Sequence, residues 1–139
     1  MTIPTAWLAD RHQAVLVTLR SDGSPQTSNI AYAVLDDVAK VSVTDGRAKT
    51  HNLRRDPRAV LHVLGDSFWQ YASVSVTAEL SNVTVEPGDA AGEELLETYE
   101  AVTGKAHPDP QEFFDAMVAE RRLVLRLTPV SAVSQGLPE

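Results

Sequence analysis

A short basic segment holds the side chains best suited to chemistry in this sequence. Residues 47–58 read Arg-Ala-Lys-Thr-His-Asn-Leu-Arg-Arg-Asp-Pro-Arg, with five basic side chains and one acidic one. The pattern predicts a short polar helix over Lys49–Arg55 that stops at Asp56, because the residue before a proline disfavours helical backbone angles. On such a helix Lys49, Asn52 and one of the arginines converge on one face.

The start of this helix is suited to an anion. Free backbone N–H groups and the positive end of the helix dipole lie there, and Arg47 and Lys49 add full positive charges. The alternative is a solvated basic surface that pairs with the segment Glu79–Glu120, which has eleven acidic residues and one basic residue. Charge alone leaves both interpretations open.

The composition excludes several other kinds of site. The chain of 139 residues has no cysteine, which excludes disulfides, thiolate zinc sites and cysteine nucleophiles. The four histidines are scattered without the spacing of metal ligands, so no metal site is expected. Neither a glycine-rich phosphate loop nor a nucleophile elbow occurs.

Charge and length limit the partners and the location. The formal net charge of −7 argues against nucleic acid or an anionic membrane as a partner. The first ten residues have no basic signal region, and no apolar run is long enough to span a membrane. We expect one cytoplasmic domain over residues 1–139.

Most of the chain is predicted to be β structure. Apolar and alternating patterns predict six strands: Gln13–Arg20, Gln26–Leu35, Ala39–Thr44, Ala59–Leu64, Trp69–Val85, and Arg122–Thr128. Short turns, such as the Asp36-Asp37 turn, connect the early strands and favour antiparallel pairing. These strands predict a small antiparallel barrel with helical additions.

The helical additions lie at the N-terminus and before the last strand. A short helix is predicted through Trp7 and Leu8. A longer helix from Asp89 to Gly104 places Leu95, Tyr99 and Val102 on one face. A further helix begins at Pro110, with Asp109 as its N-cap, Glu112 completing a capping box, and an inward face of Phe113, Met117 and Val118.

Four parts of the chain together resemble a known family. They are the stretch 23–29 (Gly-Ser-Pro-Gln-Thr-Ser-Asn), the stretch 43–59 around the basic segment, Trp69, and Arg121-Arg122-Leu123. The sequence resembles the pyridoxamine 5'-phosphate oxidase-like flavin and deazaflavin oxidoreductases, and specifically their actinobacterial branch that uses coenzyme F-420. The resemblance covers roughly residues 10–134. It implies a six-stranded antiparallel split β-barrel and a homodimer with two coenzyme sites between protomers.

The resemblance also assigns ligand-binding residues in the basic segment. It implies that the phosphate in the coenzyme tail lies around Arg47, Lys49 and Thr50. Asn52 and Arg55 would support the phosphate or the tail.

The remaining assigned residues surround the coenzyme ring. The resemblance implies that Gln26 and Asn29 face the ring edge, that Ser42 and Thr44 line the site from the neighbouring strand, and that Trp69 packs beside the ring. Without the resemblance, a core or dimer position is the simpler interpretation of this tryptophan.

Other chemically capable residues receive no catalytic assignment. Arg121 and Arg122 either reach the acidic tail of the coenzyme or form a charge pair at a strand edge. Tyr32 and Tyr71 are expected to serve packing, as strand tyrosines usually do. No catalytic residue is assigned, in keeping with a cofactor that carries the hydride while the protein supplies position and electrostatics.

The function implied by the resemblance is that of a reductase dependent on reduced coenzyme F-420. It would transfer a hydride to an electron-poor small molecule such as an activated alkene or a quinone. One alternative is an FMN-dependent oxidase or reductase of the same fold. Another is a non-catalytic carrier of coenzyme F-420 or of heme.

Overall fold

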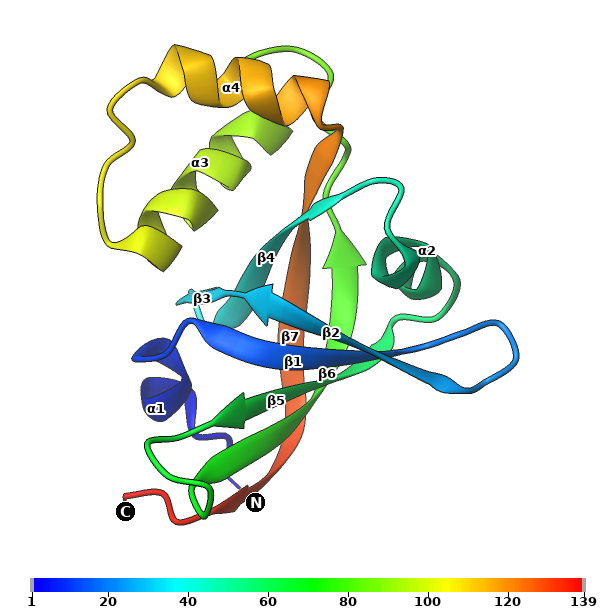
Figure 1. Cartoon of the computed structure of the whole chain (residues 1–139), viewed down its shortest axis with the longest axis vertical. Helices are drawn as coiled ribbons and strands as arrows, with labels where there is room; N and C mark the ends of the chain where they lie inside the picture. The colour runs from blue at the N-terminus through cyan, green and yellow to red at the C-terminus, as the bar shows by residue number, and fades with distance from the viewer. Residues whose placement is uncertain (1, 139) are drawn as a thin grey trace.

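One antiparallel sheet dominates the structure (Figure 1). The computed structural model describes residues 2–138. The sheet has seven strands in the order β2-β1-β5-β6-β7-β4-β3. Their bounds are β1 (Gln13–Leu19), β2 (Pro25–Ala31), β3 (Ala33–Leu35), β4 (Val38–Thr44), β5 (Arg58–Leu64), β6 (Tyr71–Leu80) and β7 (Arg122–Gln135). The helices are α1 (Thr5–Ala9), α2 (Ala48–Arg55), α3 (Ala90–Thr103) and α4 (Pro110–Ala119).

The sheet curls into a split barrel around an apolar core. In Figure 1, β1, β2 and β5 cross in front of β4, β6 and β7. Alternate residues of each strand point inward, and Leu16, Leu61, Val74 and Leu125 are fully buried there. The edge strands are β2 and β3, and β2 comes into contact with β4 across the split. We call the gap between β2 and β4 the seam.

The sheet has seven strands where six were expected, because the predicted strand Gln26–Leu35 is interrupted at Tyr32. Before the break β2 pairs with β1, and after it β3 pairs with β4. The Tyr32 side chain is fully buried and its hydroxyl donates to the Leu8 carbonyl at 2.8 Å. The chain therefore passes from one side of the seam to the other at this residue, a change that the continuous strand pattern did not indicate.

Two strand ends also differ from the prediction. The strand expected over Trp69–Val85 is β6, which begins at Tyr71 and already ends at Leu80. The last strand continues past Pro129 to Gln135, because a bulge at Ser75/Val76 of β6 accommodates the register shift opposite the proline.

The predicted turns and helices agree more closely with the structure. Asp36 and Asp37 both have positive φ angles, as a two-residue hairpin turn requires. The N-cap of α4 is confirmed, since the Asp109 carboxylate accepts the Glu112 N–H at 3.1 Å. The capping box is incomplete, because the Asp109 N–H donates to His107 Nδ1.

Helices α3 and α4 form a hairpin that covers one end of the split barrel. Glu94 of α3 accepts two hydrogen bonds from Arg126 of β7, at 2.6 and 2.8 Å, and pairs with Lys40 of β4 at 3.2 Å. A small apolar cluster of Leu95, Phe113 and Val124 joins the two helices to β7. The α3–α4 hairpin is therefore fixed to the strands beside the seam.

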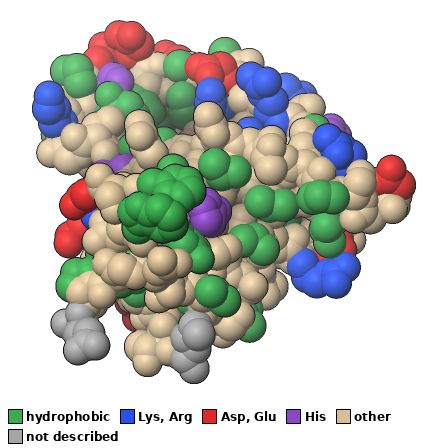
Figure 2. Space-filling model, turned by 60° about the horizontal axis from the view of Figure 1, so that its bottom comes forward, with side chains coloured by type: hydrophobic (Ala, Val, Ile, Leu, Met, Phe, Trp, Pro, Cys, Tyr) green, Lys and Arg blue, Asp and Glu red, His purple; other side chains and the backbone are tan. Residues whose placement is uncertain are grey.

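Several large apolar side chains are exposed at the other end of the sheet. They lie on the β5–β6 connection and the nearby strands, and Figure 2 shows a hydrophobic group standing out beside a histidine. The exposed residues are Leu64, Phe68, Trp69, Val130 and Val133. Phe68 and Trp69 pack edge to face with ring centres 4.8 Å apart, and a contiguous exposed apolar patch commonly marks a binding surface. None of the helices within residues 2–138 is long and apolar enough to cross a membrane.

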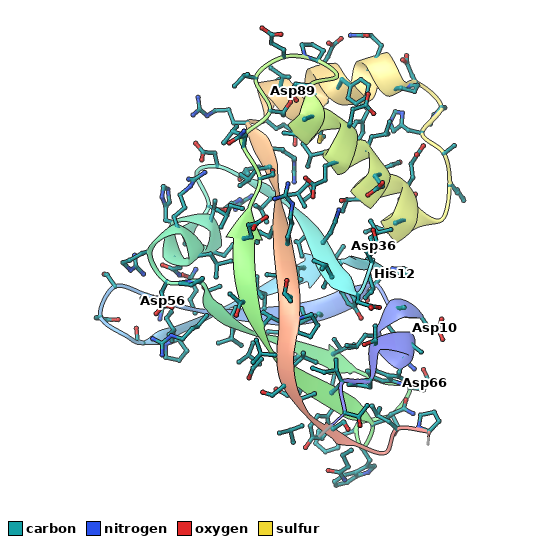
Figure 3. All side chains as sticks on the ribbon, turned by 180° about the vertical axis from the view of Figure 1, so that it is seen from behind. Asp10, His12, Asp36, Asp56, Asp66 and Asp89 are labelled. Atoms are coloured by element: carbon teal, nitrogen blue, oxygen red, sulfur yellow. The ribbon has the colours of Figure 1, made fainter. Side chains whose placement is uncertain are left out.

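Asp89 stabilises the segment that leads from β6 into the α3–α4 hairpin (Figure 3). Its carboxylate accepts hydrogen bonds from the Thr84 hydroxyl and from the N–H groups of Val85, Glu86 and Gly92. Burial acts to raise the Asp89 pKa, but these hydrogen bonds outweigh it and lower the pKa to about 2.

Replacing this carboxylate should weaken the whole fold. We predict that Asp89→Ala lowers the free energy of unfolding by about 1–3 kcal/mol, and that Asp109→Ala, which loses a single capping bond, costs about 1 kcal/mol. Urea unfolding at pH 7 measures both. Because the folded pKa is depressed, the Asp89 contribution is present above the unfolded-state value of 3.8 and disappears as the pH falls through about 2. A loss below about 1 kcal/mol for Asp89→Ala would contradict this assignment.

Candidate functional site

A cavity opens at the seam, between β2, β4 and the α3–α4 hairpin. It has a volume of about 400 Å³, which lies within the usual range for small-molecule sites. Its strand side combines the polar residues Asn29 and Ser42, the cations Arg122 and Lys49 (from α2), and the apolar residues Ile30, Ala31 and Val41. Its hairpin side is mostly apolar, with Leu95, Tyr99, Val102, Phe113 and Met117. We call this space the seam cavity.

Helix α2 is held in place at the seam by its own polar side chains. The Thr50 hydroxyl is fully buried and donates to the Thr44 carbonyl at 2.8 Å. The Asn52 amide donates to Thr18 Oγ1 and Gln26 Oε1, both at 3.0 Å. These bonds tie α2 to β4 on one side and to the β1–β2 hairpin on the other, and so fix the position of Lys49.

Arg55 completes this attachment. Its guanidinium donates to the Leu19 carbonyl at 2.8 Å and to Asn52 Oδ1 at 3.1 Å. Of the residues predicted to surround the phosphate, Thr50, Asn52 and Arg55 therefore have hydrogen-bond partners within the chain. Their roles in binding a ligand remain predictions. In the structure their side chains hold α2 against the neighbouring strands.

The remaining two cations of that prediction are available to a ligand. Within residues 2–138, no salt bridge joins Arg47 or Lys49 to a carboxylate. Two neighbouring arginines do have partners: Arg54 pairs with Asp45 at 2.6 Å, and Arg58 pairs with its neighbour Asp56 at 2.8 Å. Some cations of the basic segment are thus paired with carboxylates, while Arg47 and Lys49 have no such partner within residues 2–138.

Lys49 lies in an unfavourable place for a positive charge. Partial burial, followed by the nearby charges of Arg47 and Arg122, lowers the pKa of its ammonium group. An anion bound beside these cations would relieve their mutual repulsion. The geometry therefore favours an anionic group at this end of the seam cavity.

The two consecutive arginines before β7 have different surroundings. Arg122 lines the seam cavity, donates to Ser42 Oγ at 3.3 Å and pairs with Glu120 at 2.9 Å. Arg121 is 72% exposed and pairs with Asp45 at 3.1 Å. Of these two arginines, Arg122 lines the seam cavity and Arg121 does not.

The residues predicted to surround the coenzyme ring are only partly together. Asn29 and Ser42 line the seam cavity. Gln26 and Asn29 are three residues apart on one strand, so their side chains point to opposite faces, and Gln26 is bonded to Asn52. Thr44 contributes its carbonyl to Thr50. Trp69 is 68% exposed and lies on the β5–β6 connection, far from the α3–α4 hairpin (Figure 1).

Sequence reasoning missed the hairpin wall of the cavity. Tyr99 and Val102 of α3 and Met117 of α4 line it, although they were expected only to pack against the core. Their shared helical faces were visible in the sequence. The open space in front of them was not, because it depends on how far the hairpin lies from the seam.

A second, larger cavity of about 840 Å³ is lined by residues of β1, β2 and β5, and it shares Asn29, Ile30 and Ala31 with the seam cavity. Two histidines, His12 and His62, line it together with Arg11. His12 Nδ1 lies 3.0 Å from the Tyr32 carbonyl oxygen. Because a carbonyl can only accept, Nδ1 carries the proton in this contact, and in the neutral ring the lone pair is then on Nε2. Within residues 2–138, no three His, Cys, Asp or Glu side chains form a metal-binding group.

The seam cavity combines features suited to a phosphorylated planar cofactor. The Lys49 end offers charge, and the hairpin side offers an apolar surface. Such a donor set fits a cofactor held by its phosphate, with its ring between strand and helix.

Comparison with known proteins supports the fold. A solved structure of an F-420 reductase is 20% identical, with a TM-score of 0.69, over 96% of this chain and 98% of that one. A conserved hypothetical protein from Mycobacterium tuberculosis is 26% identical, with a TM-score of 0.72, over 100% of this chain and 91% of that one. The heme storage protein HutZ from Vibrio cholerae is 15% identical, with a TM-score of 0.65, over 91% and 88%.

A match to a family model establishes the family of this chain more firmly than these structural similarities do. The model for pyridoxamine 5'-phosphate oxidase matches residues 5–134, which include every strand except the last residue of β7, and the whole of the seam cavity. The expected resemblance is thereby confirmed at the level of the family, and the chain belongs to the pyridoxamine 5'-phosphate oxidase family.

Proposed function

We propose that this protein is a reductase that uses reduced coenzyme F-420 to reduce an electron-poor small molecule. The observation that carries the proposal is the placement of Lys49, a cation without a carboxylate partner within residues 2–138, in the wall of a cavity with an apolar side. Family membership and the structural likeness to an F-420 reductase support it.

Different residues of the seam bind different parts of the coenzyme. Arg47 and Lys49 bind its phosphate, while Asn52 and Arg55 keep α2 against the β1–β2 hairpin. Asn29 and Ser42 contact the ring from the two sides of the seam. When bound, the reduced coenzyme supplies a hydride to the acceptor, and solvent supplies the proton that completes the two-electron reduction.

We also propose that the protein is a homodimer. The exposed apolar residues on the β5–β6 connection, Phe68 and Trp69, support an interface at that end of the sheet. Burial in such an interface would account for the exposed position of Trp69 in a single chain. Sedimentation equilibrium should give twice the mass of 15.1 kDa, and a monomer at micromolar concentration would contradict the proposal.

Removing the Lys49 charge should weaken coenzyme binding. We predict that Lys49→Ala raises the Kd for coenzyme F-420 roughly 10- to 100-fold, the usual effect of losing a charge-assisted hydrogen bond. Arg58→Ala is the matched control. It removes a positive charge from the same segment, but that charge is already paired with Asp56. Fluorescence titration of the purified protein measures all three affinities.

The same titration distinguishes the coenzymes. If wild-type protein fails to bind coenzyme F-420, or if Lys49→Ala and Arg58→Ala behave alike, the proposal is wrong. A yellow protein with the absorption of FMN would instead favour the FMN-dependent oxidase or reductase.

Affinity should also depend on pH through Lys49. The ammonium group must be protonated to attract the phosphate, and its pKa is lowered by burial and by the charges of Arg47 and Arg122. Affinity should therefore decline as the pH rises through this lowered pKa, beginning below the ordinary lysine value of 10.5. Lys49→Arg should remove this decline, since arginine stays charged. An identical alkaline decline in both proteins would contradict the assignment.

A heme carrier is the second candidate function, and His12 is the observation that favours it. Its Nε2 lone pair is free for a metal, and its ring borders the larger cavity. A heme storage protein shares the fold. On this alternative, ferric heme binds with a shifted Soret band that His12→Ala abolishes and the exposed-site control His51→Ala retains. Unchanged spectra in wild type would eliminate it.

A further inference from the structure

One face of the sheet carries no charged side chain. Three rows of five residues cross β2, β1, β5, β6 and β7, and their side chains point away from the core. The middle row is Asn29, Val15, His62, Ser73 and Val133. The flanking rows run from Thr27 of β2 to Ser131 of β7, and from Ala31 to Gln135. All fifteen residues are exposed or half-buried. We call them the uncharged face.

Charge returns where the uncharged face ends. In the next row Arg58 of β5 lies opposite Thr77 of β6, and Glu79 follows two residues later. Figure 2 shows the middle of the molecule in green and tan around a histidine, with blue and red groups toward the margins. Charged residues make up 22% of the chain, so their absence from fifteen outward positions sets this face apart. Depletion of charge is what marks the core of a protein–protein interface.

The partner that fits this face is a second copy of the chain. Each copy has a net charge of −7, so two copies repel one another, and contact through the uncharged face keeps their charges apart. In a twofold contact the same face is used from both sides. Two uncharged faces need no matching charges to meet.

Area and continuity support the same partner. Neighbouring strands lie about 4.8 Å apart with about 3.3 Å between residues, so five strands of five residues cover roughly 400 Å² as a flat area. Leu64 and Tyr71 end the face at the β5–β6 connection, where Phe68 and Trp69 are 78% and 68% exposed. With this aromatic pair, the face approaches the roughly 800 Å² that each partner of a stable complex buries.

His62 is the central residue of the uncharged face. It lies on the middle strand of the five and in the middle row. It is also the one residue of the fifteen whose type ordinarily changes charge between roughly pH 5 and 8. The wall of the larger cavity includes His62, so a second copy docked on this face would close over its ring.

The groups around His62 give a positive charge little support. Its ring centre lies 5.4 Å from that of Tyr71. Asp10, Arg11 and His12, which precede β1, line the same cavity, so a single carboxylate is accompanied by a cation and a second histidine. Within residues 2–138, no carboxylate forms a salt bridge with His62. A protonated imidazole enclosed between two copies would therefore be a buried charge without an ion partner, which is costly.

We propose that a second copy docks on the uncharged face and that protonation of His62 reverses the docking, so that the protein is a dimer at neutral pH and dissociates in mild acid. This inference rests on the homodimer of the proposed function and adds its surface and its regulation. The sign follows from linkage. Two separate chains bind protons at His62 that the dimer excludes, so a falling pH favours the separate chains.

Sedimentation equilibrium of the full-length protein tests the role of His62. Between about pH 7.5 and about pH 5.5 a histidine side chain ordinarily passes from mainly neutral to mainly protonated. At constant ionic strength, we expect the Kd of the wild-type dimer to rise at least roughly 10-fold at the lower pH. His62→Gln cannot take up this proton and should keep the same Kd at both pH values. His51→Gln, at an exposed histidine of α2, is the matched control and should behave like wild type.

A fixed charge tests the surface independently of pH. Ser75→Glu places a carboxylate in a flanking row of the uncharged face and should raise the dimer Kd at least roughly 10-fold at about pH 7.5. Thr77→Glu is its control, two residues along β6 and beside Arg58, and should change the Kd less than about 2-fold. Both positions are exposed, and circular dichroism at both pH values verifies that each variant is folded.

The outcomes separate this inference from the proposed function. The inference is overturned if the wild-type Kd is the same at both pH values, if His62→Gln dissociates in acid as wild type does, or if Ser75→Glu behaves like Thr77→Glu. The homodimer and the coenzyme site stand in each of these cases. A wild-type monomer at about pH 7.5 would overturn the proposed homodimer and this inference together, while the coenzyme titration decides the reductase separately.

Discussion

The failure of the sheet to close is the constraint on which the rest of the structure depends. The edge strands β2 and β3 have a hydrogen-bonded neighbour on one side only, and β2 meets β4 across the seam without joining it. An apolar core still forms inside the curl. The open seam must then be covered by α2 and by the α3–α4 hairpin, and each brings different chemistry: cations from α2, and an apolar surface from the hairpin.

Much of the fold could be predicted from local patterns, and the parts that could not depend on tertiary contacts. Strand alternation, the Asp36-Asp37 turn and the Asp109 cap are local signals, and the structure contains them. The break at Tyr32 is not local, since it arises because the chain must cross the seam and bury that ring against Leu8. Likewise, the passage of β7 through Pro129 depends on a bulge in its neighbour β6.

The candidate site shows the same division. The basic segment was visible as charge, but which cations are free was not, because that depends on the ion pairs of Arg54 with Asp45 and of Arg58 with Asp56. The roles of Thr50 and Asn52 in holding α2 became clear only when their hydrogen-bond partners were known. The hairpin wall was expected as core, since an amphipathic helix pattern is the same whether its apolar face meets a core or a cavity.

The proposed function requires that Lys49 and the seam cavity receive the phosphate and ring of coenzyme F-420. The most direct measurement is a crystal structure of the protein grown with the oxidised coenzyme. We expect a phosphate oxygen within hydrogen-bonding distance of Lys49 Nζ and the ring between Ser42 and the α3–α4 hairpin. A coenzyme bound instead in the cavity beside His12, or with its phosphate away from α2, would contradict it.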